Sequence, residues 1–389
     1  MFDKKFIIPY GKQWIDQSDI EAVVEALKSD WLTCGPKVDE FEKSIANYCN
    51  VKYAVAFSSG TAALHGAYNA LGIKQGDEVI TTPLTFSATS NGVVYCGGKP
   101  VFVEIKPETL NIDPEKIEEK INSKTKAIAI VDFAGQPCDF NAIEAIAKKH
   151  NLPIVEDGAH ALGSEYNGSE GSPQKVGSLA DLTILSFHPV KTICSGEGGM
   201  VLTNNQDFYE KMKIFRHHGI VKKPEGGPWY YEIEELGYNY RLTDIHCALG
   251  ISQLKKLDKF VDKRREIVAK YQIAFKNIPE IILIKEESFA KSAWHIYPVQ
   301  FNLLKLKINK KEIFEKLSEK GIKCQVHYVP VHYMPFYQKT FGYKKGDFPI
   351  TEQYYERAIT LPLFPKLTDE ELDYVIESVK EIVNYAKKQ

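Results

Sequence analysis

Residues 53–71 read YAVAFSSGTAALHGAYNAL, and this stretch is the strongest indication of the fold class. An apolar, β-prone run at 53–57 is followed at once by the small polar sequence SSGT at 58–61, and then by a helix-forming segment at 61–71. Strand-then-helix patterns return throughout the first half of the chain. Such alternation predicts a mainly parallel sheet that is covered by helices on both faces.

The rest of the chain extends this pattern and then departs from it. Further strands are predicted at 78–82, 100–105, 126–133, 152–156, 182–187 and 200–203, with an amphipathic helix at 141–150. A long helical stretch follows at 243–274. Beyond it, 294–301, a helix near 310–320 and 323–328 indicate a smaller α+β unit, and 369–387 is predicted to be a closing helix with Thr368 as its N-cap.

Composition excludes several classes of protein. The 389 residues carry a formal net charge of −2, which gives no global attraction to nucleic acid or to an anionic membrane. The first ten residues are too few and too charged for a secretory signal, and no apolar run reaches the roughly 18 residues of a membrane helix. Seven scattered cysteines without a CxxC, and ten histidines without an HExxH, favour reduced cytoplasmic thiols and no metal site.

Three segments that each follow a predicted strand carry residues suited to chemistry. The SSGT sequence at 58–61 opens a helix, where free N–H groups and hydroxyls would suit a phosphate, although a simple N-cap explains it equally well. It is neither a P-loop nor a dinucleotide fingerprint. Asp157 ends an apolar strand, where a carboxylate needs a partner such as a pyridinium nitrogen or else caps a turn.

Lys191 is the third such residue. It follows the strand at 182–187 by four positions and precedes the glycine-rich sequence SGEGG at 195–199, which allows backbone to approach a ligand closely. A lysine in a partly dry loop can act as an amine nucleophile, whereas most lysines are simply solvated. Because the carboxyl ends of parallel strands meet at one edge of a sheet, the three segments should share one cleft. A phosphate cradle, an acid and a lysine are the set that pyridoxal phosphate requires.

The sequence resembles the DegT/StrS sugar aminotransferases, a group within the fold type I pyridoxal-phosphate enzymes. The matching stretches are TCGPKVDEFE, AVAFSSGTAAL, TTPLTFSATSN, VEDGAHALGSEY, SFHPVKTICSGEGGMV, FRHHGI, GYNYRLTDIHCALGISQL and CQVHYVPVHY. They span nearly the whole chain in order. The resemblance implies a three-layer α/β/α large domain with a mainly parallel mixed sheet over 1–250, including an N-terminal arm, and a smaller C-terminal α+β domain over 251–389.

The resemblance also implies roles for individual residues. Lys191 would form the Schiff base and later move protons, Asp157 would pair with the pyridinium nitrogen, and His160 would lie near the phenolic oxygen or the ring face. The other implied cofactor contacts are Ser59, Gly60, Thr61 and Ser186 around the phosphate, Phe86 on the ring, and Asn239 reaching the phosphate from the neighbouring subunit of a homodimer. The implied contacts to the nucleotide sugar are Tyr10, Asp30, Trp31, Leu32, Thr33, Gln325, Val326, His327 and Tyr328.

Within the group, the sequence resembles the aminotransferases of pseudaminic acid synthesis. This implies transfer of the amino group of L-glutamate, which becomes 2-oxoglutarate, to C4 of UDP-2-acetamido-2,6-dideoxy-β-L-arabino-hex-4-ulose. Another UDP- or dTDP-linked keto-sugar stays open, because a sugar pocket is a few contacts from several elements. A sugar dehydratase is disfavoured by the presence of Lys191, and a silent cofactor-binding sensor by the complete cofactor set. The loop at 222–231 either closes over substrate or has no role.

Overall fold

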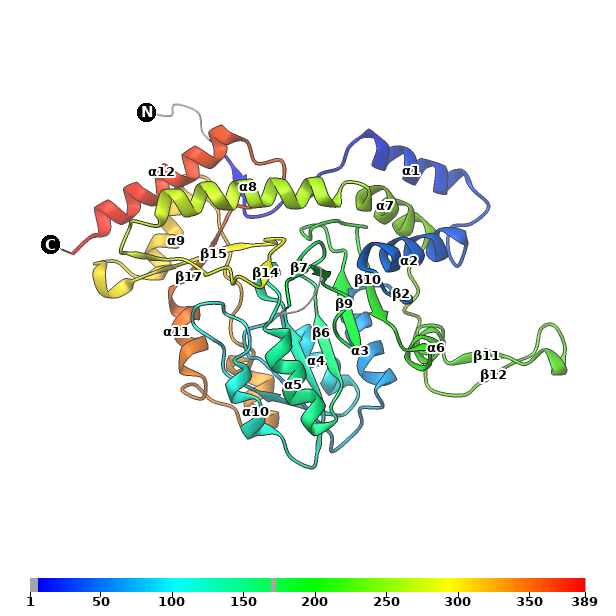
Figure 1. Ribbon diagram of the computed structural model, residues 1–389. Helices are drawn as coiled ribbons and strands as arrows, with labels where there is room; N and C mark the ends of the chain where they lie inside the picture. The colour runs from blue at the N-terminus through cyan, green and yellow to red at the C-terminus, as the bar shows by residue number, and fades with distance from the viewer. Residues whose placement is uncertain (1–5, 169–172, 389) are drawn as a thin grey trace.

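A seven-stranded sheet forms the centre of the molecule in the computed structural model, which describes residues 6–168 and 173–388 (Figure 1). In spatial order its strands are β2 (Tyr53–Phe57), β10 (Gly199–Thr203), β9 (Leu182–Ser186), β6 (Ile154–Asp157), β5 (Thr125–Val131), β3 (Glu78–Thr81) and β4 (Lys99–Phe102). Only β10 runs antiparallel to its neighbours in this sheet. The predicted mainly parallel mixed sheet is therefore confirmed, and the seven strand positions match the sequence expectation closely.

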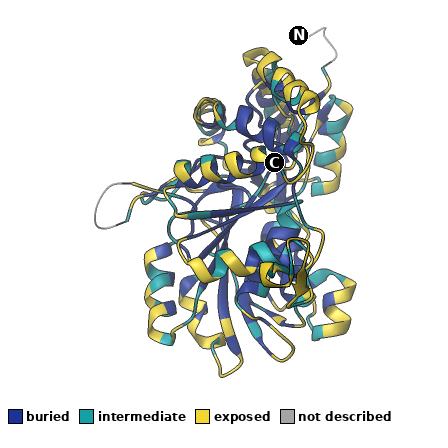
Figure 2. Cartoon of the chain, turned by 90° about the vertical axis from the view of Figure 1, so that its right-hand side faces the viewer, coloured by how far each residue is buried: buried dark blue, intermediate teal, exposed yellow. Residues whose placement is uncertain are grey.

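Helices cover both faces of the sheet and give three layers. Successive side chains of a strand point to opposite faces, so Val55 and Phe57 belong to one core cluster while Ala54 and Ala56 belong to another. One face is covered by α3 (Gly60–Ala70), α4 (Ala88–Tyr95) and α6 (Gln206–Phe215), and the other by α2 (Pro36–Cys49), α7 (Asp244–Leu254) and α5 (Phe140–His150). The strands are buried and the outer helix surfaces are exposed (Figure 2).

The C-terminal part has its own antiparallel sheet and core. The sheet comprises β13 (Ile281–Ile282), β15 (Tyr297–Phe301) and β17 (Ala358–Leu361), and it packs with α8 (Leu257–Phe275), α9 (Lys310–Glu319) and α12 (Asp369–Ala386). Two further helices, α10 (Pro335–Phe341) and α11 (Pro349–Arg357), connect it to the large sheet. Thr368 caps α12 as predicted, because its side chain accepts a hydrogen bond from the backbone N–H of Glu371.

The N-terminal arm belongs in space to the C-terminal part. Its short strand β1 (Ile8–Pro9) pairs in parallel with β16 (Ile322–Lys323), and Ile8 is fully buried in the C-terminal core. The preceding residues 1–5, on which the expectation about a secretory signal partly rests, lie outside the described residues. From the arm the chain passes through α1 (Gln17–Lys28), which packs on α7, before it enters the large sheet.

Two predicted elements differ from the structure. The helical stretch expected at 243–274 is two helices, because a turn at Lys255 and Lys256 separates the end of α7 at Leu254 from the start of α8 at Leu257. The Lys256 amine reaches away to Asp19 at 2.6 Å and Asp16 at 2.9 Å, beside α1. The segment expected at 323–328 is extended only as far as Lys323, after which Gln325 bridges to Thr360 and the chain turns toward the large sheet.

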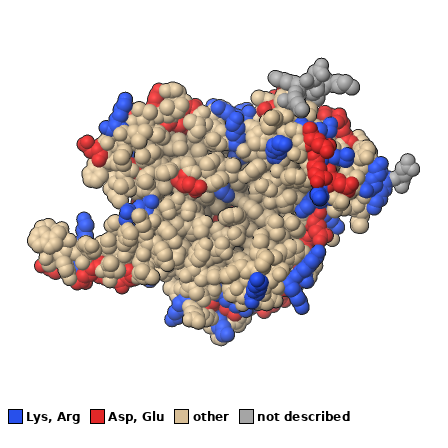
Figure 3. Space-filling view, turned by 180° about the vertical axis from the view of Figure 1, so that it is seen from behind, with Lys and Arg blue, Asp and Glu red and all other residues tan. Residues whose placement is uncertain are grey.

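A hairpin projects from the body of the molecule. Its strands β11 (Ile220–Lys222) and β12 (Tyr231–Ile233) extend to the right in Figure 1, and the same arm protrudes at the left in the reverse view of Figure 3. Large apolar side chains on it are solvent-exposed, with Trp229 at 79%, Ile233 at 64% and Leu236 at 80%. Acidic and basic residues are interspersed over the visible face in Figure 3. Within the described ranges, no helix is long and apolar enough to cross a membrane.

Candidate active site

A cavity of about 560 Å³ lies at the carboxyl ends of β2, β6 and β9. This is the edge of a parallel sheet at which ligands bind in such folds, and the volume is in the range of small-molecule sites. The residues proposed from the sequence that line it are Tyr10, Ser59, Gly60, Thr61, Phe86, Asp157, His160, Ser186, Lys191, Gln325, Val326, His327 and Tyr328. The three strand-end segments therefore do converge on one cavity, and the segment at 325–328 joins them from the C-terminal part.

The first turn of α3 forms one end of the cavity. Ser59 is the N-cap, and its side chain accepts a hydrogen bond of 3.1 Å from the backbone N–H of Ala62. The capping interpretation of SSGT is thus correct, but it leaves the hydroxyl hydrogen of Ser59 and the first-turn N–H groups directed to the cavity end of the helix. A Cβ at Gly60 would lie 3.1 Å from the Cβ of Ser186, so glycine is what allows β9 to approach this turn. The arrangement suits a phosphate.

Asp157 ends β6 and is 7% exposed. One of its carboxylate oxygens accepts a hydrogen bond of 2.6 Å from the hydroxyl of Thr89, and the other accepts one of 3.2 Å from the backbone N–H of Ala159. Burial raises the pKa of the Asp157 carboxyl, while these hydrogen bonds and the nearby Lys191 oppose the increase. A cationic ring nitrogen in the cavity would also lower the pKa of the Asp157 carboxyl and keep it ionised.

Lys191 lies in the turn after β9, where its backbone N–H donates to the carbonyl of His188 at 2.9 Å. Burial lowers the pKa of the Lys191 amine to about 8, and the Asp157 carboxylate opposes this decrease. A lysine with this pKa has a substantial neutral fraction near neutral pH, which an ordinary lysine lacks. The amine is therefore suited to act both as a nucleophile and as a proton carrier.

His160 occupies the turn that follows Asp157. Its Nε2 lies 2.9 Å from the hydroxyl of Tyr328, and its ring centroid is 4.5 Å from that of His295. Burial lowers the pKa of both histidines well below the ordinary value, so both rings are neutral. Phe86 lies at the mouth, 59% exposed, with its ring centroid 5.9 Å from that of Tyr328.

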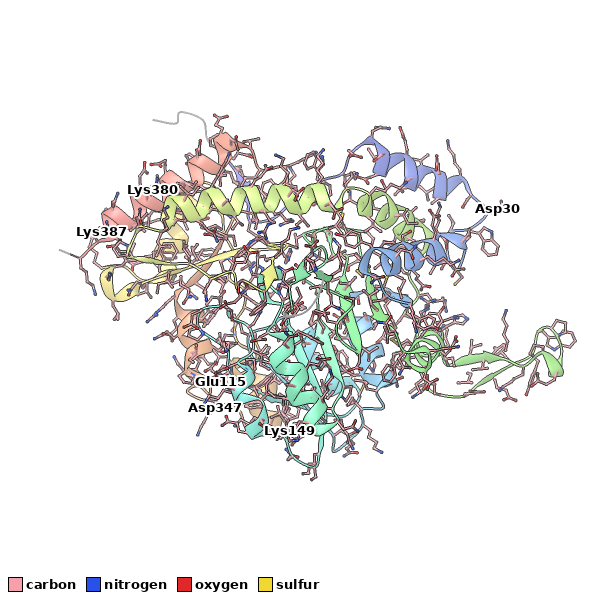
Figure 4. All side chains as sticks on the ribbon, in the orientation of Figure 1. Asp30, Glu115, Lys149, Asp347, Lys380 and Lys387 are labelled. Carbon is pink, nitrogen blue, oxygen red and sulfur yellow. The ribbon has the colours of Figure 1, made fainter. Side chains whose placement is uncertain are left out.

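Two groups of residues proposed from the sequence do not line this cavity. Asn239 is exposed, and the residues Asp30, Trp31, Leu32 and Thr33 lie beyond the end of α1. Figure 4 labels Asp30 at the outer edge of the molecule, away from the centre of the sheet. Thr33 bridges to Thr243, and the backbone N–H of Asp244 donates to the carbonyl of Leu32, so the 30–33 segment lies beside the start of α7, whereas Asn239 bridges to His217.

The structure also places residues at the site for which the sequence reasoning assigned no role. Thr89 holds Asp157, and its position one turn after Phe86 at the start of a helix was the available indication. His295 lines the cavity and is buried, but nothing in its surrounding sequence marks it. His188 and Glu197, which flank Lys191 in the sequence, line the cavity as well.

The residues present fit pyridoxal phosphate. The Ser59–Thr61 turn with Ser186 provides donors for a phosphate, the buried Asp157 requires a cationic partner, and Lys191 supplies an amine of lowered pKa. Among the described residues, the Nδ1 atoms of His160 and His295 are buried without a hydrogen-bond partner, as polar atoms that await a ligand would be.

Comparisons with known proteins agree with this site. The model of the DegT/DnrJ/EryC1/StrS aminotransferase family matches residues 13–380. A UDP-4-amino-4,6-dideoxy-N-acetyl-β-L-altrosamine transaminase of Campylobacter jejuni is 43% identical over 98% of this chain and 99% of its own. The structure of Helicobacter pylori PseC, an aminotransferase of pseudaminic acid biosynthesis, superposes with a TM-score of 0.92 at 36% identity, covering 98% of this chain and 100% of that one.

A third relative bears on the cofactor. The Streptococcus pneumoniae protein Spr1654, solved in a PLP form, superposes with a TM-score of 0.90 at 32% identity, over 98% of this chain and 99% of that one. Together with the family match and the fit of the site, this identifies pyridoxal phosphate as the cofactor. The chain belongs to the DegT/DnrJ/EryC1/StrS aminotransferase family, and it is a pyridoxal-phosphate-dependent enzyme.

Proposed function

We propose that this enzyme transfers the amino group of L-glutamate to C4 of UDP-2-acetamido-2,6-dideoxy-β-L-arabino-hex-4-ulose, a step of pseudaminic acid biosynthesis. The observation that carries the proposal is the full-length similarity, at 43% identity, to a transaminase named for the corresponding 4-amino sugar. The segment at 325–328 supports it, because the residues for which the resemblance implies sugar contacts line the same cavity as the residues for which it implies cofactor contacts.

The proposed roles of the cavity residues follow from their chemistry. Pyridoxal phosphate supplies an electron sink that makes a proton on the donor's α-carbon acidic. Nζ of Lys191 takes that proton and returns one to the sugar carbon, since its lowered pKa permits both directions. Asp157 keeps the ring nitrogen protonated, and Thr89 keeps Asp157 in place. Ser59, Gly60, Thr61 and Ser186 hold the phosphate, and Phe86 packs against the ring.

We propose further that the enzyme is a homodimer with shared active sites. Asn239 and the 30–33 segment both lie outside the cavity of their own chain, and Asn239, Trp31 and Leu32 are exposed. The projecting hairpin that precedes Asn239 exposes Trp229, Ile233 and Leu236. Exposed apolar groups of this size are typical of protein interfaces, and a two-fold dimer would place this surface against the same surface of a second copy.

The proposal is tested in two stages on purified protein. First, L-glutamate is added and the visible absorbance of the bound cofactor is followed; its loss, with stoichiometric 2-oxoglutarate, establishes the donor half-reaction. Second, the amino form is offered a panel of UDP- and dTDP-linked 4-keto-6-deoxy sugars, and return of the absorbance is measured for each. Lys191→Ala serves as the control that should be inert in both stages.

The outcomes separate the parts of the proposal. Turnover with the UDP-linked β-L-arabino keto-sugar at least about tenfold above the others supports the named substrate, since a matched pocket discriminates by more than 1 kcal/mol. Preference for the D-configured UDP-keto-sugar or for a dTDP-linked one would show that the substrate is a different keto-sugar, while the reaction would still be an amino transfer. If L-glutamate does not alter the absorbance, the proposal that it is the amino donor is contradicted.

A further inference from the structure

A hydrogen bond across the cavity joins the C-terminal part to the turn beside Asp157. The hydroxyl of Tyr328 lies 2.9 Å from Nε2 of His160, and the two rings stack with centroids 6.0 Å apart at 29°. Within residues 6–168 and 173–388, this is the one hydrogen bond that the Tyr328 hydroxyl makes. The resemblance implies a contact of Tyr328 with the nucleotide sugar, and in the structure its hydroxyl is within hydrogen-bond distance of a histidine that follows a strand of the large sheet.

The imidazole ring of His160 adopts only one tautomer at a time. Its ring is neutral, because burial and the nearby Lys191 lower its pKa, so one nitrogen carries a proton and the other does not. Its Nδ1 is buried without a partner among the described residues, whereas Nε2 faces Tyr328. Which nitrogen holds the proton is set by the hydrogen bond that the other one makes.

We propose that Tyr328 is a positioning residue whose hydroxyl donates to Nε2 of His160 and thereby places the ring proton on Nδ1. This inference rests on the proposed function and on the place near the phenolic oxygen of the cofactor that the family resemblance implies for His160. An oxygen that carries negative charge requires a donor there. With the opposite tautomer, Nε2–H would donate to Tyr328, and the buried Nδ1 would carry a lone pair and have no proton to donate.

The same contact ties the sugar side of the cavity to the cofactor side. Tyr328 follows Gln325 and Val326, which line the cavity from the C-terminal part, whereas His160 follows Asp157 on β6. His327 is anchored separately, since its Nδ1 lies 2.9 Å from the hydroxyl of Thr360 and its carbonyl accepts a hydrogen bond of 2.7 Å from Tyr354. The backbone of the segment is thus held independently of the Tyr328 hydroxyl, which is free to act on His160.

The test is a pH titration of the visible absorbance of the holoenzyme, with neither glutamate nor sugar present. In Tyr328→Phe the pH at the midpoint of the absorbance change should rise by about half a unit or more. The reason is that the deprotonated form of the bound cofactor loses a fixed hydrogen-bond donor to its charged phenolic oxygen. Tyr354→Phe is the matched control: it removes a buried hydroxyl that holds the same segment but does not contact His160. Its midpoint should equal that of the wild type.

A second background distinguishes an indirect role from a direct one. In His160→Gln, adding Tyr328→Phe should shift the midpoint no further, since the tyrosine acts through the histidine. An equal shift in both backgrounds, or equal shifts in the Tyr328→Phe and Tyr354→Phe variants, would overturn the inference. Selective ¹⁵N labelling of histidine in the wild-type holoenzyme gives an independent result: a proton on Nδ1 of His160 is expected, and a proton on Nε2 refutes the proposal.

Failure of this inference and failure of the proposed function look different. A visible band with an unchanged midpoint in Tyr328→Phe overturns the role of Tyr328 and leaves the aminotransferase reaction intact. A protein without a visible band after incubation with pyridoxal phosphate would remove the cofactor itself, and with it both proposals. Neither readout depends on which keto-sugar the enzyme uses.

Discussion

The amine of Lys191 owes its reactivity to its surroundings. Burial lowers its pKa to about 8 from an ordinary 10.5, and the Asp157 carboxylate resists this decrease. At pH 7 the neutral fraction is therefore about a tenth, whereas an ordinary lysine would be neutral in well under a thousandth of the molecules. The lysine is recognisable in the sequence, but the size of this effect depends on the packing around it.

The rate at which cofactor-free protein takes up pyridoxal phosphate should follow this pKa. Because the group is a base whose neutral form reacts, the second-order rate constant should rise about tenfold per pH unit below 8 and level off above it. Stopped-flow absorbance measures this directly. In Asp157→Asn the charge that opposes the decrease is lost, so the midpoint should move to lower pH. A wild-type midpoint near 10 would contradict the lowered pKa of Lys191.

At the scale of elements, the meeting of β10 with the first turn of α3 shapes the end of the cavity where we propose that the phosphate binds. A Cβ built on Gly199 would lie 2.4 Å from the carbonyl oxygen of Ser59 and 2.6 Å from the backbone nitrogen of Gly60. These are backbone atoms, so no side-chain rotation relieves the overlap. Gly199 is therefore required by the close approach of a strand and a helix that are about 140 residues apart in the sequence.

Gly199→Ala should separate these two elements. We expect a loss of about 1–3 kcal/mol in the free energy of unfolding, which is typical of overpacking, together with weaker retention of pyridoxal phosphate because the donors of the turn move. Denaturant unfolding and equilibrium dialysis of the cofactor measure the two effects. Gly168→Ala is the control, since its methyl would meet only side chains at ordinary distances, the nearest being Tyr166 at 3.5 Å. Normal cofactor retention in Gly199→Ala would contradict this view of the phosphate end.

The elements themselves were predictable to different degrees. The strand at 53–57 and the capped helix that begins after Thr368 agree with the sequence expectation, because apolar runs and capping residues act locally. The helices Gln17–Lys28 and Pro36–Cys49 were not predicted, and the break at Lys256 was missed. Lys256, at that break, pairs with the distant Asp16 and Asp19, which no local pattern reveals. The division into domains at 1–250 and 251–389 stays a prediction.

At the scale of the whole molecule, the proposed dimer predicts that two inactive variants complement each other when they form a mixed dimer. If Asn239 serves the partner's cofactor, a subunit with Lys191→Ala and a subunit with Asn239→Ala should each be inactive alone but should form one intact site together. Random mixing should restore about a quarter of the wild-type activity, because half of the dimers are mixed and each has one complete site. Activity is measured after the two variants are refolded together.

The result that would contradict shared sites is activity of the mixture that does not exceed that of the Asn239→Ala protein alone. A Trp229→Ala, Ile233→Ala variant of the hairpin offers a physical control, since it changes exposed apolar side chains and no cavity residue. Sedimentation of that variant should show more monomer than the wild type if the hairpin contributes to the interface.

The sequence alone determined the sheet, the family and the polar residues at the strand ends, because strand periodicity, the SSGT turn, Asp157 and Lys191 are each encoded in short contiguous segments. Only the tertiary structure decided how distant segments act on one another. It joined Tyr328 to His160 and Thr89 to Asp157, and it kept Asn239 and the 30–33 segment outside their own cavity. The physical reason is that hydrogen-bond partners and lowered pKa values depend on burial among residues remote in sequence, which local pattern does not record.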